Sequence, residues 1–132
     1  MTATIKFDGG TRPTNPGPSA IGYIVSTDNS TEERSHHIGE ATNNQAEYHA
    51  LIQGLQTARQ MGCTDVVVRG DSQLVVKQMQ GEWNVNDSGL RTLWKRATEL
   101  AEEFESFDIQ HIPREENEDV NRLVDRAFSE SG

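Results

Sequence analysis

Residues 42–51 read TNNQAEYHAL, and this stretch predicts the start of a long helix from which the rest of the chain can be interpreted. Thr42 is a favourable N-cap residue, and Gln45, three residues later, can complete a capping box. Apolar residues at helical spacing supply the buried face, namely Ala46, Ala50, Leu51, Leu55 and Ala58. Asn43 and Glu47 lie four residues apart and therefore share a different, polar face. Taken alone, the stretch is explained by a capped helix that carries an ordinary solvent-exposed glutamate.

Strands and helices flank this helix in two different arrangements. Before it, alternating apolar and polar residues separated by turn residues predict strands at 3–8, 19–27 and 31–38, connected as hairpins. After the helix, which we expect to end near residue 62, a Val-rich run at 65–70 is typical of a buried parallel strand. The remaining expected elements are helices at 72–80, 90–104 and 117–129 and a last strand at 107–112. This order predicts a mixed sheet covered by helices.

Length and composition limit the kinds of protein that this chain can be. Its 132 residues fit one compact domain, residues 1–132, with a core of its own. The four histidines have no cysteine partners at zinc-site spacing, and the single cysteine, Cys63, favours a reducing, cytoplasmic compartment. Because we find neither a signal-peptide core nor an apolar run of membrane-spanning length, we expect an intracellular protein without membrane contact. The net charge of −9 argues against a broad basic footprint on nucleic acid, but it is compatible with a small polar site that holds cations.

Three acidic residues occupy comparable positions relative to the expected elements. Asp8 ends the first strand in front of a Gly-Gly turn at 9–10, Asp71 directly follows the Val-rich strand, and Glu47 lies in the first turns of the helix. Each residue also has an ordinary explanation, as a turn former, a helix N-cap or a surface charge. Because neighbouring strand ends of a mixed sheet meet at one edge, we expect the three carboxylates to converge.

Converging carboxylates predict a metal site. They repel one another and stay ionised only when a cation joins them. Hard oxygen ligands without Cys or His suit Mg²⁺ or Mn²⁺. Two such ions about 4 Å apart would activate a water and stabilise the leaving oxygen of a phosphodiester. The predicted chemistry is metal-dependent phosphodiester hydrolysis.

Four motifs occur in order along nearly the whole chain. They are DGG at 8–10, TNNQAEY at 42–48, VRGDSQLVVKQMQG at 68–81 and REEN at 114–117. Together they resemble ribonuclease HI, especially its short bacterial and archaeal types. This resemblance implies the RNase H-like α/β fold, a five-stranded mixed sheet of three antiparallel strands followed by parallel ones, flanked by helices. It also implies an endonuclease that hydrolyses the RNA strand of RNA/DNA hybrids with two Mg²⁺ or Mn²⁺ ions and leaves 5′-phosphate ends. Nothing in the sequence indicates an oligomer or a protein partner, so we expect a monomer.

The resemblance also implies roles for individual residues. Asp8, Glu47 and Asp71 match three of the four acids that form the family's catalytic metal site. The residues that match the family's substrate contacts are Gly9, Gly10, Thr42, Asn43, Asn44 and Gln73. The asparagines and the glutamine would reach base edges and ribose 2′-hydroxyls, and recognition of the 2′-hydroxyl distinguishes RNA from DNA. Thr42 would help to hold a phosphate of the DNA strand.

The fourth acid of the family is replaced in this chain. The aligned position in the final helix is Asn121, which we assign as a catalytic and metal-binding residue. Three explanations remain open: a neutral ligand in a working enzyme, an engineered substitution, or an inactive module that binds hybrids. We favour a working or weakened enzyme, because an asparagine carbonyl can ligate a hard cation. Asp125 is a weaker substitute because it lies about 6 Å further along the helix axis.

The surroundings of the site give further predictions. Trp83 stands where many relatives carry basic residues, and it either stacks on a sugar of the DNA strand or anchors the following helix. Weak, salt-sensitive substrate binding is therefore expected. His111 is expected to be structural, and Glu115 or Glu116 is assigned to product release. A structure-selective DNA nuclease on the same fold is a further alternative, because a fold does not determine a substrate.

Overall fold

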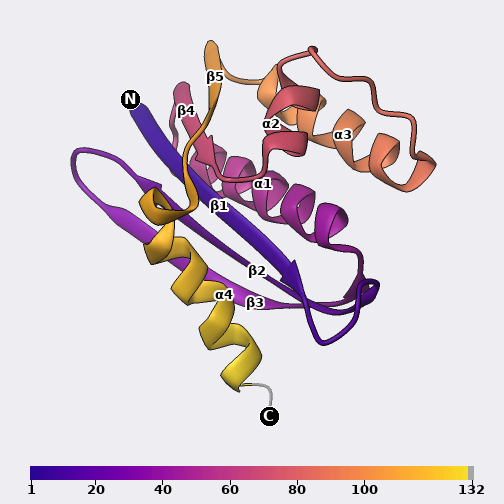
Figure 1. Cartoon of the computed structure of the whole chain (residues 1–132). Coiled ribbons are helices and arrows are strands. Elements are labelled where there is room, and N and C mark those ends of the chain that lie inside the picture. The colour runs from indigo at the N-terminus through magenta and orange to yellow at the C-terminus, as the bar shows by residue number, and fades with distance from the viewer. Residues whose placement is uncertain (131–132) are drawn as a thin grey trace.

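A five-stranded mixed sheet organises residues 1–130, which the computed structural model describes (Figure 1). The strand order is β3-β2-β1-β4-β5. The strands are β1 (Thr2–Thr11), β2 (Gly17–Ser26), β3 (Thr31–Ala41), β4 (Asp65–Gly70) and β5 (Ser106–His111). β1, β2 and β3 pair antiparallel, whereas β4 pairs parallel with both β1 and β5. The predicted sheet of three antiparallel strands followed by parallel ones is confirmed.

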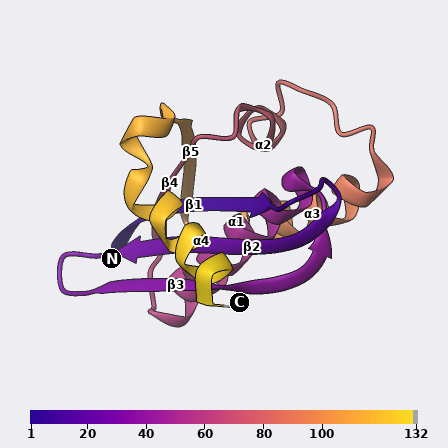
Figure 2. The same cartoon turned by 60° about the horizontal axis from the view of Figure 1, so that its bottom comes forward.

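Helices cover both faces of this sheet. They are α1 (Asn43–Gln60), α2 (Gln73–Met79), α3 (Ser88–Ala101), the short 3-10 helix η1 (Arg114–Glu116) and α4 (Glu118–Glu130). Figure 2 shows α4 in front of β1, β2 and β3, with α1 and α3 behind the sheet. The chain therefore forms three layers, with the sheet between α4 on one face and α1 and α3 on the other.

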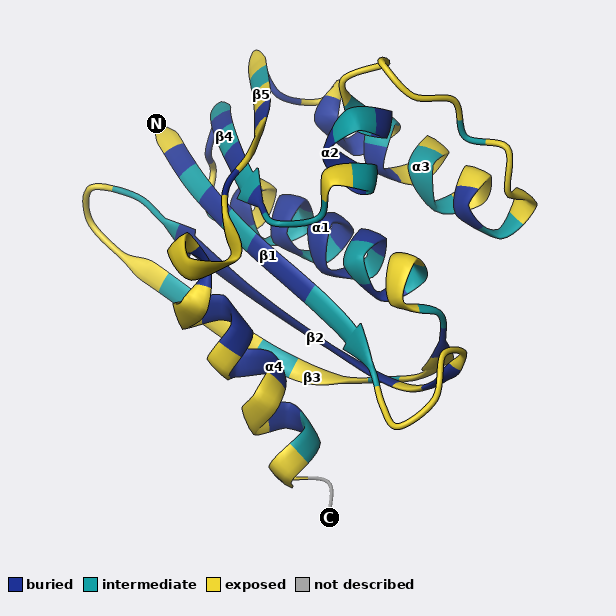
Figure 3. Ribbon diagram, in the orientation of Figure 1, coloured by how far each residue is buried: buried dark blue, intermediate teal, exposed yellow. Residues whose placement is uncertain are grey.

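Alternate residues of β2 enter separate cores on the two faces. Ile21, Tyr23 and Val25 belong to the main core, together with buried residues of α1 and α3. Ala20 and Ile24 face the other way and pack against apolar residues of α4. Figure 3 shows buried residues along the sheet and on the helix faces that lie against it. This period of two is what a strand covered on both faces requires.

The start of α1 is fixed by the predicted capping box. The Gln45 backbone N–H donates to Thr42 Oγ1 at 3.1 Å, and the Thr42 N–H donates to Gln45 Oε1 at 2.9 Å. α1 ends at Gln60, close to the predicted end at residue 62, and Gly62 then turns the chain with a φ of +83°. Local sequence signals therefore set both ends of this helix.

Other predicted boundaries are wrong for a physical reason. The first strand was expected to end at Asp8 before a Gly-Gly turn, but β1 continues to Thr11 because Gly9 and Gly10 pair with Ile21 and Ala20 of β2. α3 begins two residues before the predicted position 90, because the Asp87 side chain accepts from Leu90 N at 3.0 Å, and it ends at residue 101 instead of 104.

Two expectations about the whole chain can be compared only with residues 1–130. Within residues 1–130, no helix combines the length and the apolar character that crossing a membrane requires. The predicted single domain extends to residue 132, and residues 131–132 lie outside the described residues. The domain boundaries therefore stay a prediction.

Candidate active site

The three predicted acids meet at one edge of the sheet. Asp8 is in β1, Asp71 directly follows β4, and Glu47 is in the first turns of α1. Each offers a carboxylate oxygen, and these oxygens all lie within 4.8 Å of one another. Asp8 is buried, and Glu47 and Asp71 are at least partly buried. The convergence follows from the parallel pairing of β1 with β4, in which Phe7 is in register with Gly70.

Gly9 brings the first strand close enough to α1 for the acids to meet. A Cβ atom at this position would lie 2.4 Å from the backbone carbonyl carbon of Ala46, closer than any side chain permits. The Gly9 backbone N–H also donates to Glu47 Oε1 at 2.8 Å. A glycine is therefore needed here to orient the glutamate, in addition to the substrate contact expected from the sequence.

The electrostatics of the carboxylate cluster favour the neutral forms of Asp8 and Glu47. Burial, with the Asp71 charge as the next cause, raises the pKa of Asp8 from 3.8 to about 7. Burial also raises the pKa of Glu47 well above its usual value, and the charges of Asp8 and Asp71 act in the same direction. Arg114 is the nearby cation, with Nη1 4.0 Å from Asp71 Oδ2, and it lowers the pKa of Asp8. A bound cation would oppose the same repulsion more strongly.

Asp71 of the carboxylate cluster and two asparagines of the segment 117–121 carry unpaired side-chain oxygens. In the part of the chain that the structure describes, the buried side-chain oxygens that accept no hydrogen bond are Asp71 Oδ2, Asn117 Oδ1 and Asn121 Oδ1. The Asn121 amide nitrogen donates to the Arg114 carbonyl at 3.5 Å, while the Asn117 amide nitrogen donates to the Phe7 carbonyl at 3.0 Å, next to Asp8. Because buried polar atoms are nearly always paired, these unpaired oxygens are suited to bind a ligand. Sequence reasoning did not single out Asn117 or Arg114, although both belong to the REEN motif.

A cavity of about 320 Å³ opens beside the carboxylates. Its lining combines Asp8, Gly9, Gly10, Thr11, Arg12, Asn43, Asn44, Glu47, Arg114 and Val124. Four of the predicted substrate contacts, the two glycines and the two asparagines, therefore lie beside the acids. Asn121 does not line this cavity but a neighbouring one of about 290 Å³, and Arg114 lines both cavities.

The other two predicted contacts lie outside the lining of that cavity. The Thr42 hydroxyl is engaged in capping α1. Gln73 is exposed at the start of α2, two residues after Asp71.

Asn43 is tied to the β1–β2 connection, because its Oδ1 accepts from Thr11 N at 2.9 Å and its own backbone N–H donates to Asn15 Oδ1 at 3.1 Å. These bonds fix the Asn43 side chain with its amide nitrogen available as a donor.

The structure also distinguishes between roles suggested for the surrounding residues. Asp125 forms an ion pair with Arg12, so its carboxylate is already engaged with a cation. Trp83 is 44% exposed and lines a cavity of about 570 Å³. Trp94, whose indole N–H donates to the Gln78 carbonyl at 3.2 Å, is the tryptophan that anchors α3. His111 is exposed at the end of β5, and the 3-10 helix η1 contains Glu115 and Glu116.

The sheet order and the position of the carboxylates define the ribonuclease H-like fold class. Comparisons with known proteins agree with this class. The family model described as "Reverse transcriptase-like" matches residues 6–127. The chain is 46% identical over 127 residues to the ribonuclease HI of Halobacterium salinarum, which covers 95% of this chain. The chain therefore belongs to the ribonuclease H family.

Solved structures give the same result. The crystal structure of RNase H1 from the halophilic archaeon Halobacterium salinarum superposes with a TM-score of 0.94 and 42% identity, covering 98% of this chain and 99% of that one. LC11-RNase H1, solved in complex with an RNA/DNA hybrid, superposes with a TM-score of 0.90 and 37% identity, covering 98% of each chain. This chain spans only 63% of the length of the curated Halobacterium relative and 36% of the mycobacterial ones.

Proposed function

We propose that this chain is an endonuclease that hydrolyses the RNA strand of RNA/DNA hybrids with two Mg²⁺ or Mn²⁺ ions and leaves 5′-phosphate ends. The observation that carries the proposal is the convergence of three carboxylates, with oxygens within 4.8 Å of one another, beside a polar cavity. Membership of the ribonuclease H family supports the reaction, and the hybrid bound to LC11-RNase H1 supports the substrate.

The donor atoms of the site fit hard divalent cations. Asp8, Glu47 and Asp71 would hold the ions through carboxylate oxygens, and Asn121 would add its unpaired carbonyl oxygen. Oxygen donors without Cys or His favour Mg²⁺ or Mn²⁺ over softer metals. When bound, two such ions supply Lewis acidity to the attacking water and to the leaving oxygen. The chain itself holds the ligands close together, and burial raises the pKa of Asp8 and Glu47, so cation binding would compete with protons for these carboxylates.

Substrate recognition falls to polar groups around the cavity. Asn43 and Asn44 line it and would reach base edges and 2′-hydroxyls, with Gln73 acting from the start of α2. The backbone of Gly9 and Gly10 would add contacts to the RNA strand, and Thr42 would help to hold a DNA phosphate. Because recognition of the 2′-hydroxyl requires hydrogen-bonding groups placed beside the reacting phosphate, these residues favour hybrids over duplex DNA.

A second candidate function is a module that binds hybrids with little or no cleavage. The observation that favours it is Asn121, which removes one negative charge from the metal site. We expect Asn121→Asp to raise metal affinity without being required for turnover, because the carbonyl oxygen of the asparagine remains a ligand.

Cleavage of a labelled RNA/DNA hybrid in Mg²⁺ and in Mn²⁺ tests the proposal. Glu47→Gln serves as the inactive reference, and Asn121→Asp is assayed alongside the unaltered chain. Cleavage by the unaltered chain but not by Glu47→Gln supports the enzyme. If only Asn121→Asp cuts while the unaltered chain merely binds, the hybrid-binding module is the correct description.

We also infer that the chain works as a monomer in the cytoplasm. Among residues 1–130, the exposed large apolar side chains are Met1 and Trp83, which do not form a patch of the size that oligomers bury. The lone cysteine, Cys63, is free and buried, which suits a reducing compartment. Light scattering of the purified chain tests the oligomeric state.

A further inference from the structure

Arg12 lies at one end of the active-site cavity and is held in place by α4. It directly follows β1 and lines the cavity together with Gly9 and Gly10. Its guanidinium forms an ion pair with Asp125 and lies over the Phe128 ring, 4.5 Å from the ring centroid. Its backbone N–H donates to the Pro18 carbonyl at 2.9 Å. Both the side chain and the backbone of Arg12 are therefore fixed before any substrate binds.

The two basic residues in the described lining of this cavity stand in different places. Arg114 approaches Asp71 and lies next to the carboxylates. Arg12 is four residues beyond Asp8, which corresponds to about 13 Å of extended strand. Arg12 is therefore better placed for another phosphate of the same nucleic-acid strand than for the phosphate that would react beside the carboxylates. Arg12 is thus suited to binding the substrate away from the reacting bond.

The ion pair leaves part of the Arg12 guanidinium available. Asp125 accepts from Nη2, and an arginine has five N–H donors arranged in a planar fork. The Arg12 side chain is 49% exposed, so a phosphate can reach the remaining donors. Arginine binds phosphates through paired charge-assisted hydrogen bonds, and stacking on an aromatic ring lowers the entropy lost when those bonds form. Such a contact is important because the chain has a net charge of −9 and therefore few cationic side chains that can neutralise the phosphates of the substrate.

We propose that Arg12 binds a backbone phosphate of the RNA strand, at a position away from the cleavage site, and that Asp125 and Phe128 hold its guanidinium ready for this contact. The inference rests on the proposed function, because it takes the hybrid as the occupant of the cavity. Asp125 competes with the phosphate for the same cation, so it orients Arg12 at some loss of affinity. Asp125→Asn therefore strengthens hybrid binding, whereas Arg12→Ala weakens it.

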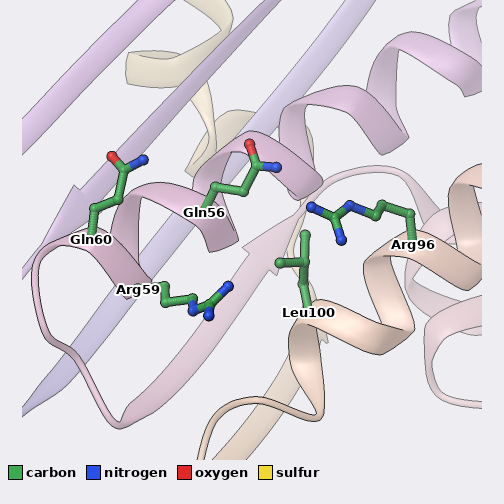
Figure 4. A pocket seen from close by; sticks show the side chains of 5 residues that line it. All are labelled: Gln56, Arg59, Gln60, Arg96 and Leu100. Atoms are coloured by element: carbon green, nitrogen blue, oxygen red, sulfur yellow. The ribbon is translucent and has the colours of Figure 1, made fainter.

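The chain offers a matched control in another exposed ion pair. Arg59 Nη1 lies 3.0 Å from Glu103 Oε2, and the Arg59 side chain is 59% exposed. Figure 4 shows Arg59 in a pocket of about 440 Å³ between α1 and α3, together with Gln56, Gln60, Arg96 and Leu100. Arg59 is twelve residues after Glu47, or about 18 Å along α1, beyond the screening length of about 8 Å at physiological salt. Arg59→Ala and Glu103→Gln make the same charge changes without touching the proposed site.

The test measures hybrid binding against salt concentration in the Glu47→Gln background, where cleavage does not interfere. Each lost phosphate contact lowers the slope of log affinity against log salt by about 1. When salt is raised from 50 to 200 mM, both proteins lose affinity for the hybrid. The factor lost by the protein that retains Arg12 should be about three times the factor lost by Arg12→Ala. Arg59→Ala and Glu103→Gln should leave the slope unchanged. An unchanged slope for Arg12→Ala, in a protein that binds hybrids and melts normally, would overturn the inference.

A second measurement locates the phosphate. Hybrids that carry one neutral methylphosphonate linkage, moved along the RNA strand, should show one position that weakens binding when Arg12 is present but not in Arg12→Ala. If the sensitive linkage lies in the DNA strand, or if no linkage depends on Arg12, the assignment is wrong. If Arg12→Ala lowers only the melting temperature, the residue merely ties the β1–β2 connection to α4. Failure of the Glu47→Gln background and the unaltered chain to bind any hybrid would instead overturn the proposed function itself.

Discussion

Two neighbouring residues of α1, Glu47 and Tyr48, point into different regions. Buried polar groups repel one another in the first region and are paired by hydrogen bonds in the second. Glu47 points into the carboxylate cluster, where like charges crowd together and the pKa is raised. Tyr48 points into a network under α2, where its hydroxyl donates to Gln78 Oε1 at 2.6 Å. Gln78 Nε2 in turn donates to the Asn84 carbonyl at 3.2 Å, and the Gln78 carbonyl accepts from the Trp94 indole at 3.2 Å.

The difference separates a region that stabilises the fold from a region suited to bind cations. In the network under α2, buried donors and acceptors are paired, which stabilises the fold and ties the segment after α2 to α3. In the carboxylate cluster, burial and repulsion destabilise the fold unless protons or cations are bound. Natural proteins retain such unfavourable clusters mainly at functional sites. Changing each region separately should therefore affect different properties of the protein.

The largest expected effect is the loss of cleavage in Glu47→Gln. Weaker cation binding removes several kcal/mol of transition-state stabilisation, so cleavage should fall by at least about a hundredfold. The same change should raise the melting temperature at pH 8 in EDTA, because folding no longer has to oppose the ionisation of a buried acid, while the glutamine oxygen can still accept from Gly9 N. Activity assays and thermal melts of one protein preparation measure both effects. A lower melting temperature would mean that Glu47 is mainly structural.

The next largest effect concerns the network under α2. Tyr48→Phe leaves Gln78 Oε1 buried without its donor, which costs about 1–3 kcal/mol of unfolding free energy. Cleavage per folded molecule should change little, since the carboxylates do not contact the Tyr48 hydroxyl.

Tyr23→Phe is the matched control for this prediction. The Tyr23 hydroxyl donates to Gln53 Oε1 at 3.4 Å, a long and only partly buried bond, so its loss should cost less than about 0.5 kcal/mol. Urea denaturation of the two variants measures both values. Equal losses in the two variants would show that the network contributes no more than an ordinary surface hydrogen bond.

The contrast between the two regions also explains what could be predicted from the sequence. α1 was predicted within two residues, because the Thr42–Gln45 capping box and the apolar spacing are local signals. The convergence of Asp8, Glu47 and Asp71 was predicted because strand ends in a mixed sheet share an edge. Both inferences use information within one element or a general rule of sheet topology.

Contacts between distant residues could not be predicted in this way. The continuation of β1 through Gly9 depends on its partner Ile21 in β2, and no feature near Gly9 indicates that pairing. The ion pair between Arg12 and Asp125 joins residues 113 positions apart, and the bond between Tyr48 and Gln78 joins residues 30 positions apart. Such contacts are decided by tertiary packing, so the network under α2 and the support of Arg12 emerged only from the structure.

The last prediction, which leaves cleavage by the metal-loaded protein untouched, concerns the pH dependence of stability without metal. The pKa of Asp8 is about 7 in the folded protein and near 3.8 when the residue is exposed. Between these values the unfolded chain loses a proton that the folded chain keeps, so stability falls as pH rises from about 4 to 7 and then levels off. In EDTA the melting temperature should therefore fall by about ten degrees across this window, and it should fall less in Asp8→Asn.

Magnesium should reverse this trend, which makes the pH profile a direct test of the contrast between the two regions. Ionised carboxylates bind the cation, so the gain in melting temperature on adding Mg²⁺ should grow as pH rises through 7. Tyr48→Phe should shift the whole curve downward without changing its shape, because the hydroxyl stays protonated throughout this range, its pKa being raised by burial. Thermal melts from pH 4.5 to 8, with EDTA and with Mg²⁺, distinguish these outcomes. A flat curve in EDTA would show that the carboxylate cluster retains no protons, and the distinction between the two regions would then fail.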